Sequence, residues 1–152
     1  MQDDFTEIMN NLTENARFAL QKSDYYAKRY NNGYMSTEHL LLGILSQDTS
    51  TGARFLADED VNLESVEKTI NHTAVEVPGS QMAMMSLSEA AVLTLRMAAN
   101  FTKEQGIKLI GTEHILYALL RQPNSRASLI LQGLKVDLNN LTNTIEEYTE
   151  KQ

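Results

Sequence analysis

The chain repeats itself once, with a constant offset of 75 residues. Residues 12–70 align with residues 87–145 without a gap, and the polar triplet Thr37-Glu38-His39 returns as Thr112-Glu113-His114. A polar triplet that recurs in register is much harder to explain by convergence than apolar positions on a helical face. The chain is therefore a duplicated unit, and we expect its functional site to be built twice.

Apolar residues recur in each repeat at the spacing that is typical of helices, and they predict four helices per repeat. In the first repeat the helices are expected over about 13–30, from Thr37, after Ser50-Thr51 and after Asn62, where good N-cap residues stand. In the second repeat they are expected over about 88–105, 112–121, 125–132 and 137–150. No alternation of apolar and polar residues is long enough to predict a sheet.

The expected fold class is all-α: a compact bundle of eight helices from two pseudo-two-fold related four-helix repeats. One domain is expected over residues 1–152, with repeat one at 12–71, a linker at 72–86 and repeat two at 87–146. The linker contains Pro78-Gly79 and has no helical period. An extended solenoid generally needs about three or more repeats, so we expect the two repeats to pack face to face.

Composition excludes several classes of function. The chain has 13 Lys and Arg against 20 Asp and Glu, a net charge of −7, which disfavours nucleic acid and anionic membranes as partners. Without cysteine it has no disulfide, thiolate zinc site or cysteine nucleophile. Its longest apolar stretch, Leu40 to Leu45, is far short of the roughly 20 residues of a membrane span, and no signal peptide is seen. We expect a cytoplasmic protein.

The repeated Thr-Glu-His triplet has two interpretations. In the first, Thr37 and Thr112 are N-caps, the glutamates complement the helix dipole, and the histidines are packed or hydrogen-bonded structural residues. In the second, Glu38 and Glu113 offer carboxylates to a cationic ligand, for which the planar fork of a guanidinium is the best geometric match.

The first helix of each repeat begins at a residue that suits an anion. Thr13 and Ser88 offer a hydroxyl together with the free backbone N–H groups of a helix start. A carboxylate beside such a helix start would suit a ligand that carries both charges.

Enzymatic chemistry has little support in the sequence. A metal site would need His39 and His114 from different repeats, without cysteine or a His-x-x-x-His spacing. Neither an activated nucleophile nor a phosphate-binding glycine loop is present. We therefore expect no catalytic residue, metal or cofactor. The rival is an enzyme that uses the Glu-His pairs as acid and base, and burial of both histidines would count against it.

Two motifs together carry a resemblance to a known family. Thr13-Glu14-Asn15-Ala16 and Ser88-Glu89-Ala90-Ala91 open the first helix of the two repeats, and each precedes Ser/Gly-Thr-Glu-His by about 25 residues. This doubled unit resembles the N-terminal domain of the Clp-type AAA+ unfoldases, closest to the ClpC branch, over about residues 12–146.

The resemblance implies a non-catalytic receptor module that sits above the ring of Clp ATPase domains and binds protein substrates or adaptor proteins. In ClpC-type members such domains also recognise phosphorylated arginine on proteins marked for degradation. The glutamate of Thr-Glu-His takes the guanidinium and the start of the first helix takes the phosphate. Carried onto this chain, one site is Glu38 with Thr13 and the other is Glu113 with Ser88.

The chain departs from the family pattern at two points. ClpC members usually carry basic residues beside the first helix start, whereas here the nearest in sequence are Arg17 and Arg96. Ser36 stands where the family has glycine. Two alternatives accordingly stay open: a free-standing accessory protein that docks on a Clp assembly without capturing substrate, and a packing module whose two sites have decayed. The Clp ATPase ring would be a partner in cis or in trans.

Overall fold

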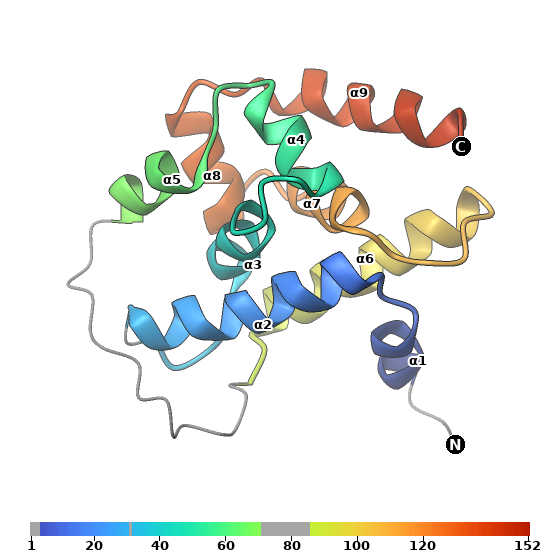
Figure 1. Ribbon diagram of the computed structural model, residues 1–152, viewed down its shortest axis with the longest axis horizontal. Coiled ribbons are helices and arrows are strands. Elements are labelled where there is room, and N and C mark those ends of the chain that lie inside the picture. The colour runs from blue at the N-terminus through green and yellow to red at the C-terminus, as the bar shows by residue number, and fades with distance from the viewer. Residues whose placement is uncertain (1–3, 31, 71–85) are drawn as a thin grey trace.

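The computed structural model describes residues 4–30, 32–70 and 86–152, which form nine α-helices and no extended strand (Figure 1). The helices are α1 (Asp4–Asn10), α2 (Glu14–Arg29), α3 (Thr37–Leu45), α4 (Thr51–Ala57), α5 (Leu63–Ile70), α6 (Glu89–Glu104), α7 (Thr112–Leu120), α8 (Arg126–Gly133) and α9 (Leu138–Glu150). The all-α class and the eight predicted helices are confirmed. The expected linker lies outside the described residues, except for Ser86.

The first helix, α1, was not predicted. It has only seven residues, which is too short for a helix that is stable by itself. It forms because it packs against α6 and buries Ile8, which is 7% exposed. Its stability therefore depends on a tertiary contact that the sequence period does not show.

Side-chain caps fix where most of the helices begin. The hydroxyls of Thr13 and Ser88 accept hydrogen bonds from the N–H groups of Ala16 and Ala91, at 3.1 and 3.0 Å. The same kind of bond starts α4, α5, α8 and α9, from Ser50, Asn62, Ser125 and Asp137. All six residues stand at the helix starts that the sequence predicted, and Ser50 and Asn62 were expected as caps.

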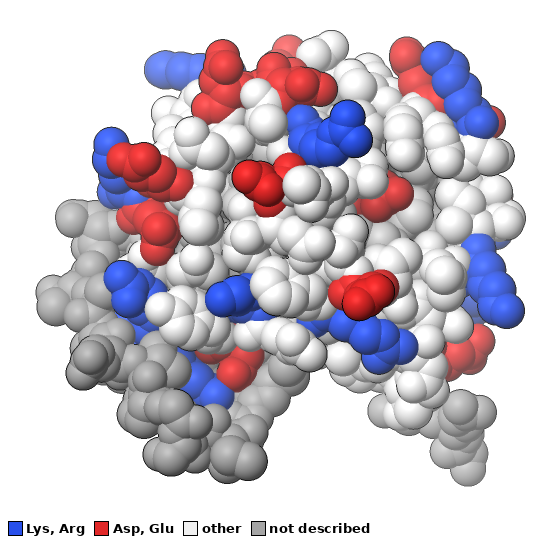
Figure 2. Space-filling view, viewed as in Figure 1, with Lys and Arg blue, Asp and Glu red and all other residues white. Residues whose placement is uncertain are grey.

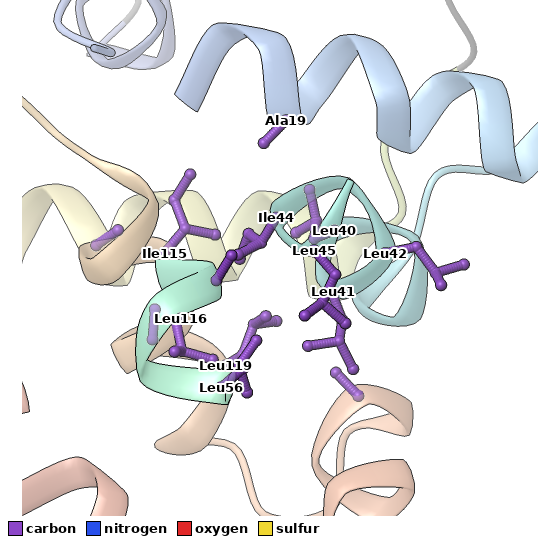
Figure 3. Close-up of a cluster of buried hydrophobic side chains, with 14 of the residues drawn as sticks. Ala19, Leu40, Leu41, Leu42, Ile44, Leu45, Leu56, Ile115, Leu116 and Leu119 are labelled. Carbon is purple, nitrogen blue, oxygen red and sulfur yellow. The ribbon is translucent and has the colours of Figure 1, made fainter. Parts of the chain in front are cut away.

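The two central helices, α3 and α7, are buried on nearly every side. All nine residues of α3 are buried, and α7 is buried at seven of its nine positions. Figure 3 shows Leu41, Leu45 and Ile44 of α3 gathered with Ile115, Leu116 and Leu119 of α7, with Leu56 of α4 and Ala19 of α2 beside them. A helix that is apolar all round has to lie at the centre of its domain, which explains why both copies occupy this place.

The first repeat brings α2 and α3 unusually close together. A Cβ atom on Gly43 of α3 would overlap the carbonyl oxygen of Ala19 and the hydroxyl of Ser23 on α2. Ser23 donates its hydroxyl proton to the same carbonyl at 2.8 Å. In the second repeat, Ala118 stands at the position of Gly43, and Ala98 stands at the position of Ser23. Because Ala118 has a Cβ atom, the second repeat lacks the glycine that allows this close approach.

The repeats are interleaved. The short helix α4 of the first repeat packs on α7 of the second, and α8 of the second packs on α3 of the first (Figure 1). Neither repeat is therefore a separate bundle, because each central helix is covered in part by the other repeat.

The surface carries both signs of charge. On the face shown in Figure 2, acidic and basic side chains are interspersed. Within the described ranges, no helix is long and apolar enough to cross a membrane.

Gly43→Ala should destabilise the fold by about 1–3 kcal/mol, because the new methyl group meets backbone that has no space to move. Gly133→Ala is the matched control, since a Cβ there meets nothing within 4 Å. Urea unfolding measures both. Equal unfolding free energies for the two variants would contradict the close packing of α2 on α3.

Candidate functional site

The threonines of the Thr-Glu-His triplets join the two repeats. The Thr37 hydroxyl accepts a hydrogen bond from the Ala127 N–H at 3.2 Å, and the Thr112 hydroxyl accepts one from the Gly52 N–H at 2.8 Å. The two bonds are equivalent under the 75-residue offset. All four residues are buried. Each threonine therefore binds the start of the third helix of the other repeat.

The prediction that these threonines cap their own helices is wrong. The N-cap positions of α3 and α7 are Ser36 and Gly111, and the threonines are the first helical residues. A first-turn side chain points away from its own N–H groups, and here it meets those of another helix.

The histidines close the caps of α3 and α7. Nδ1 of His39 accepts a hydrogen bond from the Ser36 N–H at 2.9 Å, and Nδ1 of His114 accepts one from the Gly111 N–H at 2.8 Å. The residues are 2% and 4% exposed. The structural interpretation of both histidines is confirmed, because these lone pairs are already bound to backbone.

Burial also sets the charge of His114. Desolvation lowers the pKa of His114 below 6.5, and this outweighs the neighbouring Glu113 carboxylate, which raises it. The imidazole is therefore neutral near pH 7, in keeping with an Nδ1 that accepts a hydrogen bond.

Helix α2, which opens the first repeat, begins beside the start of α7, and helix α6, which opens the second repeat, begins beside the start of α3. The Thr13 N–H donates to the Ile110 carbonyl at 2.9 Å, and the Ile110 N–H donates to the Asn11 carbonyl at 2.8 Å. In the equivalent contact, the Ser88 N–H donates to the Met35 carbonyl at 2.8 Å. Ile110 and Met35 each stand two residues before a Thr-Glu-His triplet.

This arrangement differs from the pairing expected from the sequence. Thr13 was expected with Glu38, and Ser88 with Glu113, each pair within one repeat. The structure instead brings Thr13 to the start of α7, which carries Glu113, and Ser88 to the start of α3, which carries Glu38. Each helix start that was expected to bind an anion thus lies beside the other repeat.

Glu38 is a buried carboxylate that is only half satisfied. It is 5% exposed, and its Oε2 atom accepts a bond from Nε of Arg126 at 3.0 Å. Its Oε1 atom is buried and has no hydrogen-bond partner among the described residues. A groove of about 520 Å³ adjoins it, lined by Glu38, Thr69, Ile70, Arg126, Leu129, Ile130 and Gly133. The sequence did not single out Arg126, which reaches Glu38 only because α8 packs on α3.

Glu113 has different surroundings. It is half-buried, and its Oε1 atom lies against the Cα of Gly111, where an added Cβ would overlap it. Over the ranges that the structure describes, neither an ion pair nor a hydrogen bond holds this carboxylate. The residue equivalent to Arg126 beside this site is Thr51.

The basic residue nearest in sequence to Thr13 is Arg17. Its Nη2 atom donates to the Asn10 carbonyl at 3.3 Å, which holds it near the turn before Thr13. Among the described residues, no three His, Cys, Asp or Glu side chains gather as they would around a metal ion.

The Clp repeat N-terminal domain model matches this chain twice, over residues 11–91 and 86–152. The ATP-dependent Clp protease ATP-binding subunit ClpA homolog of Trieres chinensis is 31% identical over 144 residues, which are 95% of this chain. This chain spans only 16% of the length of that relative. The chain belongs to the Clp repeat N-terminal domain family.

Solved structures agree on the fold. The N-terminal domain of ClpD from Arabidopsis thaliana superposes with a TM-score of 0.73 at 22% identity, covering 91% of this chain and 94% of that one. A ClpV N-domain in complex with a VipB peptide superposes with a TM-score of 0.70 at 17% identity, covering 93% and 89%. The helical arrangement is thus shared with proteins of quite different sequence.

Thr112→Val should destabilise the chain by about 1–3 kcal/mol, because it leaves the buried Gly52 N–H without an acceptor while keeping the side-chain shape. Thr144→Val is the control, since the Thr144 hydroxyl bonds an exposed carbonyl of its own helix. Urea midpoints compare the two variants. A loss of stability no larger than that of the control would refute the bond between the repeats.

Acid should destabilise the chain partly through His114. The pKa of this residue is depressed in the folded state, so the unfolded chain takes up its proton first as the pH falls below about 6.5, and the free energy of unfolding falls. One proton of difference contributes at most about 1.4 kcal/mol per pH unit. The decline between pH 7 and 5.5 should be shallower in His114→Gln. Parallel curves for the two proteins would contradict this role.

Proposed function

We propose that this chain is a non-catalytic receptor domain of a Clp-type ATP-dependent chaperone or protease, which binds protein substrates or adaptors. Family membership supports this, and so does the ClpV N-domain, a relative in fold that was solved with a peptide. The single observation that carries the proposal is the meeting of the α2 start with the α7 start, and of the α6 start with the α3 start. In this proposal, each meeting provides a helix start for an anion and a neighbouring helix that carries a glutamate for a cation.

The ligand that suits this combination is phosphoarginine on a protein. A guanidinium offers parallel N–H donors to a carboxylate, and a phosphate suits the free N–H groups and positive dipole of a helix start. The resemblance to ClpC-type domains points to the same ligand. The proposed sites are Thr13 with Glu113, and Ser88 with Glu38.

The phosphate should be held mainly by backbone. The residues beside the two helix starts are Glu14 and Glu89, so the local side chains weaken rather than strengthen the attraction. Arg17 lies one turn beyond Thr13 and is the cation best placed to assist. We therefore expect weak binding of the free amino acid, with more affinity coming from the surrounding peptide.

Calorimetric titration with free phosphoarginine tests the proposal. Saturable binding is expected, and it should be lost in the double variant Glu38→Ala, Glu113→Ala, because the guanidinium then has no carboxylate. Thr144→Ala is the control for an unrelated surface change, and circular dichroism confirms that each variant is folded. No heat at millimolar ligand, with the domain folded, would exclude phosphoarginine and leave adaptor docking as the function to pursue.

A further inference from the structure

The two candidate sites differ in what their polar groups already bind. At the site of Ser88 and Glu38, Oε2 of Glu38 is bound by Nε of Arg126 at 3.0 Å. The Ser88 hydroxyl donates to the Ser36 hydroxyl at 3.1 Å. The carboxylate for a guanidinium and the hydroxyl for a phosphate are thus both occupied from within the chain.

The site of Thr13 and Glu113 has neither internal partner. Thr51 stands where the other site has Arg126, and its neutral side chain offers no cation to the carboxylate. Gly111 stands where the other site has Ser36, so it offers no hydroxyl to Thr13. In the part of the chain that the structure describes, the Thr13 hydroxyl only accepts, from the Ala16 N–H, and its proton is available.

The difference between Ser36 and Gly111 also explains why the carboxylates of Glu38 and Glu113 lie in different places. Oε1 of Glu113 lies in the space that a Cβ on Gly111 would fill. Ser36 has a Cβ in the corresponding place, so Glu38 is excluded from the equivalent position. It turns instead toward α8, where Arg126 binds it.

We infer that Ser36 and Arg126 close the Glu38 site, with the Arg126 guanidinium standing in for the guanidinium of a ligand. The free chain then has one open site, Thr13 with Glu113, and one self-occupied site, Ser88 with Glu38. This inference rests on the proposed function, because it assigns the two sites of that proposal different states.

The closure is reversible. The Arg126 side chain is 67% exposed, so it can swing into solvent without disturbing the core. It contacts Glu38 through one nitrogen only and leaves Oε1 of Glu38 without a partner, whereas a bidentate guanidinium would satisfy both oxygens. A ligand at Glu38 has to compete with Arg126, whose effective concentration at the carboxylate is of the order of millimolar because it is tethered to the chain. A ligand that binds weakly is therefore excluded, whereas one that binds tightly can displace Arg126.

The test follows the backbone amides of residues 36–40 and 111–115 by NMR while methylguanidinium is added. In the natural chain only residues 111–115 should shift. In the double variant Ser36→Gly, Arg126→Thr, both groups should shift, because the tethered competitor is removed from Glu38. Lys68→Thr is the matched control, since it removes an exposed ion pair with Glu64 and should leave the Glu38 site closed.

The inference is overturned if the natural chain shows equal shifts at both groups, if the double variant stays silent at residues 36–40, or if methylguanidinium shifts residues 111–115 in neither protein. The same samples are then titrated with phosphoarginine. If methylguanidinium behaves as expected and phosphoarginine binds nowhere, phosphoarginine recognition fails while the closure by Arg126 stands.

Discussion

Two buried hydrogen bonds between the repeats determine how this chain is assembled. The hydroxyls of Thr37 and Thr112 each accept the N–H of a residue in the first turn of the other repeat's third helix. An N–H group that is buried without a partner is costly, so these bonds fix the depth and angle at which α8 meets α3 and α4 meets α7. The interleaved core follows, because each central helix is then covered from both repeats.

The interleaving also decides how the candidate sites are composed. Since the first helix of each repeat begins beside the second helix of the other, a ligand at either site would touch both repeats. In the sites that we propose, neither half of the chain contains every residue. Recognition would thus depend on the two repeats being folded together, and a substitution at their contact would weaken binding and stability at once.

Much of the fold could be predicted from the sequence because its determinants are local. The caps at Thr13 and Ser88 bond a residue three positions away, and helical spacing predicted the eight repeated helices. The role of Thr37 could not be predicted, since its partner lies 90 residues further along the chain. The same limit explains why the contact of Thr13 with Ile110 and that of Arg126 with Glu38 were not foreseen. Partners brought together by packing leave no periodic pattern in a single sequence.

The surroundings of Glu38 and Glu113 differ, while the helices that carry them occupy equivalent places in the two repeats. A crystal structure of the chain with phosphoarginine would show directly how the ligand is held. We expect the guanidinium on Glu113 and the phosphate at the α2 start beside Thr13, with Arg126 still on Glu38. A ligand that joins Glu38 to Thr13, or that lies away from both helix starts, would contradict this expectation.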